Sequence, residues 1–162
     1  MKFIELINRS DFLKETFKNL KEHFKDIEIN GISNNSKTVK KNFIFFAFAG
    51  IKTNGNLYIE EARINGAKII VSQEKEYEDT IKLTNQNYSL IYSQLCSSFY
   101  NKKPETIIAV TGTNGKTSVT DFCRQIWSFY GLKSASIGTL GIRETSEQYY
   151  HKIRNNLTTL DS

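Results

Sequence analysis

Apolar side chains recur with two different spacings along the first part of the chain. Over residues 3–24 they stand three or four positions apart among lysines and glutamates, which predicts an amphipathic helix with a break near residues 8–10. Residues 27–32 alternate between apolar and polar side chains, as in a half-buried strand. Residues 43–48 and 68–72 are apolar runs of strand length, typical of strands that are covered on both faces.

A helix is predicted between these two apolar runs. Residues 57–65 have helical spacing, and Gly66 follows as a stop signal. Polar residues 33–37 and 51–56 predict the loops that follow the strands. The order strand, loop, helix, strand predicts a small α/β unit with a largely buried sheet.

The second half of the chain predicts further elements. Residues 73–87 are polar and predict a loop with at most one weak strand. Residues 90–100 predict a helix that ends before Pro104, the only proline. The apolar residues expected on the inner face of this helix are Leu90, Ile91, Leu95, Cys96, Phe99 and Tyr100. We predict a domain boundary near residues 88–92, which gives domains 1–91 and 92–162.

The predicted second domain begins with a strand, a glycine-bearing turn and a helix. Residues 106–110 are β-branched and apolar, and residues 118–127 carry apolar side chains at helical spacing. Gly131 is expected to close this helix, and residues 133–137 to begin a second parallel strand. Residues 138–154 then predict a turn followed by an edge hairpin or strand.

The turn at residues 110–117 is a candidate phosphate-binding loop. Its glycines let backbone N–H groups point at an anion, and the helix that follows directs its unpaired N–H groups to the same place. Lys116 can reach the terminal phosphates, and the Thr117 hydroxyl can bind Mg²⁺, so both are candidate catalytic residues and Thr117 is the candidate metal ligand. The predicted cofactors are ATP and Mg²⁺. The predicted ATP-binding residues are Gly112, Thr113, Asn114, Gly115, Lys116, Thr117 and Ser118. The alternative is a glycine-rich turn with an exposed lysine.

Composition and charge exclude several classes of protein. With 39% hydrophobic and 12% aromatic residues the chain can form a packed core. Its net charge of +5 comes from dispersed lysines without a basic block, so nucleic acid is not an expected partner. No apolar run has the length of a membrane span. Cys96 and Cys123 lie in apolar helical patterns and lack CxxC spacing, so we expect buried free thiols of a reducing compartment and a cytoplasmic protein. A zinc site or a disulfide is the alternative.

Four stretches carry a resemblance to a known family. The segment T-G-T-N-G-K-T at residues 111–117 resembles the ATP loop of the Mur ligases, which join amino acids to the peptidoglycan precursor. Residues 31–71 resemble the uridine-binding domain of that family, with Asn35-Ser36-Lys37 where D-S-R is usual and Asn54-Gly55 where D-G is usual. Residues 138–141 resemble its G-T-[IVL]-G turn, and residues 156–161 resemble L-T-T-P-[DE] with leucine in place of proline.

The resemblance implies a fold and an activity. The expected fold is α/β, with a small N-terminal uridine-binding domain followed by the start of a P-loop parallel-sheet ATPase domain. The last pattern points to the family member that adds a diamino acid, meso-diaminopimelate or L-lysine, to UDP-N-acetylmuramoyl-L-alanyl-D-glutamate. ATP would convert a substrate carboxylate to an acyl phosphate, which the incoming amine then attacks. The implied substrate contacts are Asn34, Ser36, Ile51, Lys52, Thr53, Thr158 and Thr159.

Other interpretations remain open. The family's Mg²⁺-binding glutamate, carbamoylated lysine and amino-acid-binding domain have no counterpart in these residues, so we expect a fragment without ligase activity of its own. A nucleotide-binding module without catalysis is one alternative. A folylpolyglutamate-type ligase or a small kinase is another, but residues 28–72 argue against the former and chain length against the latter. Ser36 could also serve only as a turn-forming hydroxyl, and Thr158 and Thr159 could belong to a tail.

Overall fold

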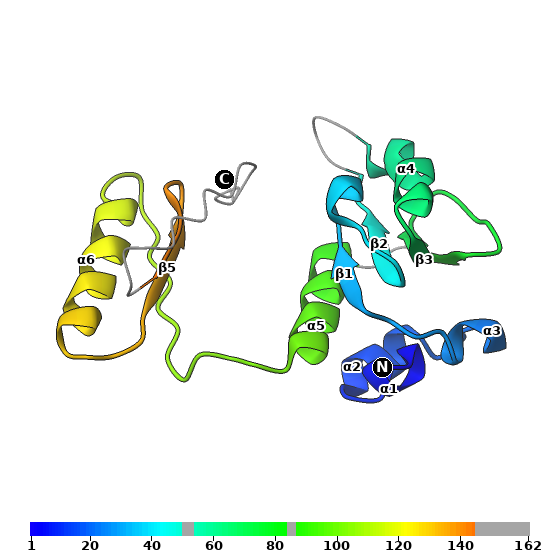
Figure 1. Ribbon diagram of the computed structural model, residues 1–162, viewed down its shortest axis with the longest axis horizontal. Coiled ribbons are helices and arrows are strands. Elements are labelled where there is room, and N and C mark those ends of the chain that lie inside the picture. Colours follow the sequence, from blue (N-terminus) through cyan, green and yellow to red (C-terminus); the bar gives the residue numbers. More distant parts are fainter. Residues whose placement is uncertain (50–53, 84–86, 145–162) are drawn as a thin grey trace. The chain divides into compact units, whose positions relative to one another are not determined.

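The computed structural model describes residues 1–49, 54–83 and 87–144. The chain divides into two compact units, with the boundary between Lys103 and Pro104. The boundary predicted at residue 91 instead falls inside helix α5 (Tyr88–Tyr100). Because this whole helix packs on the core of the first unit, the boundary between the units comes after the end of α5 (Figure 1).

A parallel sheet forms the centre of the first unit. Its strands are β1 (Gly31–Ser33), β2 (Phe43–Ala47), β3 (Ala67–Ser72) and β4 (Thr80–Lys82). They lie in the order β1-β2-β3-β4, and every neighbouring pair is parallel. Two short 3-10 helices, η1 (Ser36–Thr38) and η2 (Gly55–Tyr58), follow β1 and β2, and helix α4 (Ile59–Ile64) completes the connection to β3. The predicted α/β fold with a parallel sheet is confirmed.

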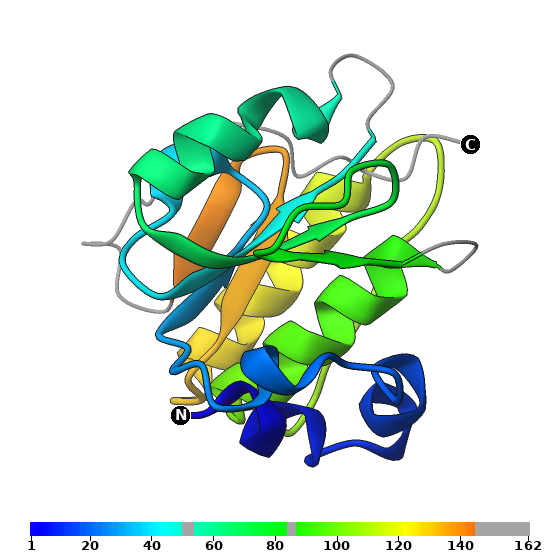
Figure 2. The same cartoon turned by 90° about the vertical axis from the view of Figure 1, so that its right-hand side faces the viewer.

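Both faces of this sheet are covered, because successive side chains of a strand point to opposite sides. On one face Phe46 and Val71 belong to a core that includes the N-terminal helices and α5. On the other face Phe45 and Ile70 pack with Ala62 of α4. Figure 2 shows α4 on one side of the sheet and α5 with the N-terminal helices on the other. Because both faces of the sheet are buried, its strands are continuous apolar runs rather than alternating ones.

The N-terminal region forms three short helices: the break predicted near residues 8–10 is confirmed, and a second break over residues 17–21 was not predicted. The helices are α1 (Phe3–Ile7), α2 (Asp11–Thr16) and α3 (Glu22–Lys25). The strand predicted over residues 27–32 enters the sheet only at Gly31, however. The residues before it pair with the chain start instead, where the Ile29 amide donates to the Met1 carbonyl at 2.8 Å.

The inner face of α5 differs in part from the prediction. Ile91 and Leu95 are buried as expected, but Leu90 is 42% and Tyr100 is 59% exposed. Tyr88 is buried instead. Residues 88, 91 and 95 are spaced by three and four positions, so they share one face of the helix, and position 90 lies away from that face.

The second unit contains a helix and a hairpin. Helix α6 (Lys116–Phe129) is followed by β5 (Ala135–Gly138) and β6 (Gly141–Glu144), which pair antiparallel. The parallel strand predicted to begin at residue 133 is therefore wrong. A short turn lets these residues pair locally, whereas a parallel strand needs a partner that is distant in the sequence. Residues 106–110 also form no strand with any residue that the structure describes.

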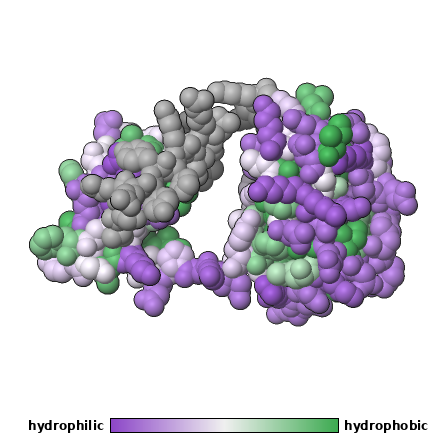
Figure 3. Space-filling model, viewed as in Figure 1, coloured by the Kyte–Doolittle hydropathy of each residue, from purple (hydrophilic) through white to green (hydrophobic). Residues whose placement is uncertain are grey.

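Apolar side chains are exposed in the second unit. They include Ile107 at 76%, Phe122 at 61% and Phe129 at 87% exposure. Figure 3 shows such residues in green at the surface of the part that carries α6. Cys96 and Cys123, expected to be buried, are both half-buried free thiols. Within the described ranges, no helix is long and apolar enough to cross a membrane.

Candidate functional site

The candidate phosphate loop ends where α6 begins. Gly115 is the N-cap residue of this helix and has φ of 79°, and Gly112 has φ of 136°. Both values lie in the left-handed region that favours glycine. A Cβ at Gly115 would meet no heavy atom within 4 Å, so backbone conformation rather than space calls for glycine there. The loop residues Thr113 and Asn114 and the first-turn residue Ser118 are exposed.

The helix start supplies polarised donors at this loop. The first intrahelical bond runs from the Val119 amide to the Gly115 carbonyl, at 2.9 Å. The amides of the preceding helical residues have no carbonyl one turn earlier to which they can donate. Together with the positive end of the helix dipole, they form a surface that favours an anion.

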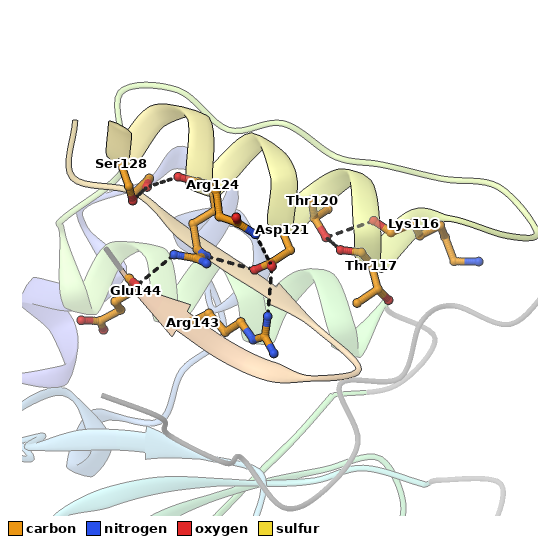
Figure 4. A network of polar contacts seen from close by, with 10 residues as sticks. Lys116, Thr117, Thr120, Asp121, Arg124, Ser128, Arg143 and Glu144 are labelled. Atoms are coloured by element: carbon orange, nitrogen blue, oxygen red, sulfur yellow. Dashed lines mark hydrogen bonds and ion pairs between the residues drawn. The ribbon is translucent and has the colours of Figure 1, made fainter. Parts of the chain in front are cut away.

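The Lys116 ammonium lies across the loop. Its Nζ donates to the carbonyl oxygens of Gly112 and of Thr113, the latter at 3.3 Å. Figure 4 shows the side chain directed away from the body of α6. An ammonium has three donor hydrogens, so two carbonyl contacts leave one for another acceptor. The lysine is therefore held at the loop and accessible to an anion placed there.

Two threonine hydroxyls meet at the first turn of α6. The Thr117 Oγ1 lies 3.2 Å from the Oγ1 of Thr139, which belongs to the turn between β5 and β6. Thr120, one turn further along the helix, instead donates its hydroxyl to the backbone carbonyls of Lys116 and Thr117, at 3.0 Å each (Figure 4). The sequence singled out Thr117, but it gave no role to Thr139.

Asp121 connects α6 to the hairpin. Its carboxylate accepts hydrogen bonds from Arg124 at 3.1 Å, from Gln125 at 2.8 Å and from Arg143 of β6 at 3.0 Å. Arg124 also donates to the Glu144 carbonyl at 3.2 Å (Figure 4). Burial would raise the pKa of Asp121, but the hydrogen bonds from Arg124, Arg143 and Gln125 outweigh it and hold the pKa below its ordinary value. The sequence did not indicate that Asp121 joins the helix to the hairpin, because Arg143 and Glu144 are distant from α6 in the chain.

In the first unit, the candidate uridine loop follows β1. Ser36 is 5% exposed, and its hydroxyl donates to Glu61 of α4 at 2.6 Å. The side-chain amide of Asn65 donates to the Ser36 backbone carbonyl at 2.9 Å. Asn35 caps η1 by accepting from the Lys37 amide at 3.0 Å, and Asn34 is exposed. Of the two predicted contact residues here, Asn34 is thus accessible to a ligand, whereas Ser36 fixes the turn to α4.

The second candidate loop follows β2. Three of its predicted contact residues, Ile51, Lys52 and Thr53, lie outside the described residues, as do Thr158 and Thr159. Directly after them, the Asn54 side chain accepts from the Asn56 amide at 2.9 Å. The roles of all these residues in binding substrate stay predictions.

A glycine and a buried hydrogen bond fix the residues after this loop. A Cβ at Gly55 would lie 2.6 Å from the Phe48 carbonyl oxygen, so only glycine permits this close approach of the backbone. The Asn56 side-chain carbonyl accepts from the buried Ser72 hydroxyl at 2.6 Å. These contacts hold the start of η2 against the carboxyl ends of β2 and β3, the edge at which parallel sheets bind ligands.

The residues at the candidate phosphate loop fit a Mg²⁺ ion that takes few ligands from the protein. Hydroxyl oxygens are hard ligands, and Mg²⁺ in nucleotide sites takes most of its ligands from phosphate and water. No group of three or more His, Cys, Asp or Glu side chains that could hold a metal occurs among the described residues. The Thr117 hydroxyl at the first turn of α6 thus suits the role of a protein ligand that acts next to phosphate and water oxygens.

Comparisons with known proteins agree on one family. Residues 28–109 match the family model described as Mur ligase family, catalytic domain, and residues 110–162 match Mur ligase middle domain. The chain is 43% identical over 126 residues to UDP-N-acetylmuramoyl-L-alanyl-D-glutamate--2,6-diaminopimelate ligase of Zymomonas mobilis, covering 77% of this chain and 26% of that protein. The protein of the same name from Rickettsia bellii is 39% identical over 142 residues, covering 88% and 29%.

A solved structure shows the same fold. The structure of a UDP-N-acetylmuramoyl-L-alanyl-D-glutamate--2,6-diaminopimelate ligase matches with a TM-score of 0.65 at 24% identity. The match covers 89% of this chain and 28% of that one. The chain therefore spans between 26% and 29% of the length of these relatives.

Proposed function

The chain belongs to the Mur ligase family, and on that premise we propose that it forms the nucleotide-binding part of an ATP-dependent amide ligase of peptidoglycan synthesis. The ligase would add a diamino acid to UDP-N-acetylmuramoyl-L-alanyl-D-glutamate. Both relatives named above carry a name with this substrate and with 2,6-diaminopimelate, which favours this amino acid over L-lysine. We expect the reaction in the cytoplasm, the compartment that supplies ATP.

The observation that carries the proposal is the geometry of the loop before α6. Left-handed glycines at 112 and 115, unpaired amides at the helix start and an ammonium held at the loop converge on one place. All of these groups are donors or positive, so they favour the negatively charged phosphates of ATP. The predicted contacts of Thr113, Asn114 and Ser118 follow from their exposed positions around this loop.

The first unit would bind the uridine diphosphate part of the second substrate. The exposed Asn34 and the edge formed by the carboxyl ends of β1 and β2 support this assignment. Ser36 would contribute to this site by holding the turn that carries Asn34, through its bond to Glu61. Contacts from Ile51, Lys52 and Thr53, and from Thr158 and Thr159 on the muramoyl-peptide side, are part of the same proposal.

In the proposed reaction a substrate carboxylate attacks the γ-phosphate of ATP, and ADP leaves as the acyl phosphate forms. The amine of the diamino acid then attacks the acyl carbon, phosphate leaves, and the nitrogen loses a proton to give the amide. Both partners in the first step are anionic, so repulsion must be reduced before they meet. Lys116 would exchange its loop carbonyls for phosphate oxygens and neutralise charge there. The amides of the helix start would fix the phosphate position. Mg²⁺, which Thr117 would hold, supplies further positive charge when bound.

Calorimetric titration of the 162-residue chain with a non-hydrolysable ATP analogue and Mg²⁺ tests the proposal. We expect saturable binding that the substitution Lys116→Ala weakens by tenfold or more, on the order of one charge-assisted contact. Lys133→Ala removes the same charge from an exposed position in the same unit and should leave binding unchanged. Equal binding by both variants, or none by the unsubstituted chain, would contradict the proposal.

A further inference from the structure

The turn between β5 and β6 brings a second hydroxyl to the phosphate loop. Gly138 and Gly141 are paired across the hairpin, which leaves Thr139 and Leu140 as the turn residues. Thr139 Oγ1 lies 3.2 Å from the Oγ1 of Thr117. We propose that Thr139 is a positioning residue that accepts the hydroxyl proton of Thr117 and so directs the Thr117 lone pairs toward a bound Mg²⁺. This inference rests on the proposed function.

The chemistry of a hydroxyl group gives the contact its direction. A hydroxyl has one hydrogen and two lone pairs, and either threonine can donate in the structure as it stands. A cation beside Thr117 repels the hydroxyl hydrogen and attracts a lone pair. The hydrogen then needs an acceptor on the other side, and the Thr139 oxygen is within hydrogen-bond distance. Cation binding therefore selects the arrangement in which Thr117 donates and Thr139 accepts.

Several contacts keep the two hydroxyls together. The Asp121 carboxylate binds Arg143 of β6 at 3.0 Å, and Arg124 donates to the Glu144 carbonyl at 3.2 Å. These bonds fix α6 to the hairpin whose turn carries Thr139 (Figure 4). Threonine is β-branched and has a stiff χ1, so neither hydroxyl swings far from the other once the backbones are fixed.

The contrast with Thr120 supports a specific role for the pair. Thr120 satisfies its hydroxyl within the helix by donating to the carbonyls of Lys116 and Thr117. This is the usual behaviour of threonine inside a helix. Thr117 lies in the same helix, but its hydroxyl contacts Thr139 on another element of the unit. The Thr117 oxygen thus stays at the surface of the loop, where a nucleotide-bound cation would lie.

The test compares nucleotide binding with and without Mg²⁺. ADP is titrated into the full chain in excess Mg²⁺ and again in EDTA, by calorimetry, and the ratio of the two dissociation constants is the readout. Thr139→Val removes the hydroxyl at constant volume and should lower this ratio by about threefold to tenfold, on the order of one hydrogen bond. Binding in EDTA should stay the same. Thr139→Ser keeps a hydroxyl and should retain most of the ratio.

Controls separate the role of Thr139 from damage to the fold. Leu140→Ala changes the other turn residue and should not alter the ratio, whereas Thr117→Val should abolish most of it. Trp127, the only tryptophan of the chain, lies on α6, so its fluorescence during thermal unfolding reports whether each variant retains the second unit. If Thr139→Val unfolds, Thr139→Ala replaces it as the variant without a hydroxyl.

Each outcome bears on the inference. A loss of the Mg²⁺ effect in Thr139→Val, with recovery in Thr139→Ser, supports it. The role of Thr139 is overturned if folded variants without its hydroxyl keep the ratio of dissociation constants while Thr117→Val loses it. That result would not contradict the proposed nucleotide site. Absence of ADP binding by the unsubstituted chain overturns both the proposed function and this inference.

Discussion

The substitution Asp121→Ala should destabilise the second unit strongly for a single side chain. Its carboxylate accepts from Arg124, Gln125 and Arg143, and its side chain is only 15% exposed. Removing it takes one carboxylate contact away from each of two guanidinium groups, those of Arg124 and Arg143, which are 11% and 24% exposed. A fully buried charge that loses its partner costs about 3–5 kcal/mol, and partial hydration lowers this to about 2 kcal/mol here. Arg124 keeps its bond to the Glu144 carbonyl, which limits the loss further.

Urea unfolding followed by Trp127 fluorescence measures this effect. The chain contains one tryptophan, and it lies on α6, so the signal reports the helix that Asp121 stabilises. Asp121→Asn keeps an acceptor oxygen but loses the charge, and it should show about half of the effect. Glu105→Ala removes an exposed carboxylate of the same unit and serves as the control. A change in Asp121→Ala no larger than in this control would refute the role given to the network.

Further predictions concern the first unit. Phe46→Ala should lower the free energy of unfolding by about 3–5 kcal/mol, because the Phe46 side chain is fully buried and lies 5.1 Å from the Tyr92 ring. Phe12 is 39% exposed, so Phe12→Ala should lower the free energy of unfolding by less than about 1 kcal/mol. Urea unfolding followed by far-ultraviolet circular dichroism compares the two variants. Equal losses of unfolding free energy would contradict the assigned core. Burial would raise the pKa of Asp79, but the hydrogen bonds and charge of Arg63, 2.6 Å away, outweigh it and lower the pKa. The pair therefore stabilises the fold above the ordinary carboxyl pKa of 3.8, and this stabilisation is lost as the pH falls through the lowered value. Asp79→Asn should thus show a smaller drop in urea midpoint between pH 7 and pH 3, and an equal drop in both proteins would refute this.

The elements that were predicted best are those that depend on residues close together in the sequence. The apolar runs that became β2 and β3 are buried on both faces, so their composition alone indicated the parallel sheet. The glycine-bearing turn and the start of α6 were also predictable, because Gly112, Gly115 and Lys116 act on their immediate neighbours in the chain. The break between α1 and α2 followed from polar residues that interrupt the apolar spacing.

Contacts between distant residues were beyond prediction from local pattern. Residues 133–137 were assigned to a parallel sheet, yet β5 pairs with β6, since a turn nearby in the sequence offered an antiparallel partner. The bond from Ser36 to Glu61 and the meeting of Thr117 with Thr139 depend on how separate elements pack. The family's G-T-[IVL]-G pattern was a signal for Thr139, but by itself it named no partner.

The central claim is that residues 112–118 bind the phosphates of ATP, and amide chemical shifts test it most directly. In a nitrogen-15 labelled sample of the chain, titration with a non-hydrolysable ATP analogue and Mg²⁺ should shift the amide signals of Gly115, Lys116 and Thr117 more than any others. These amides lie where the loop meets the start of α6. Largest shifts elsewhere in the chain, or none at saturating nucleotide, would contradict the claim.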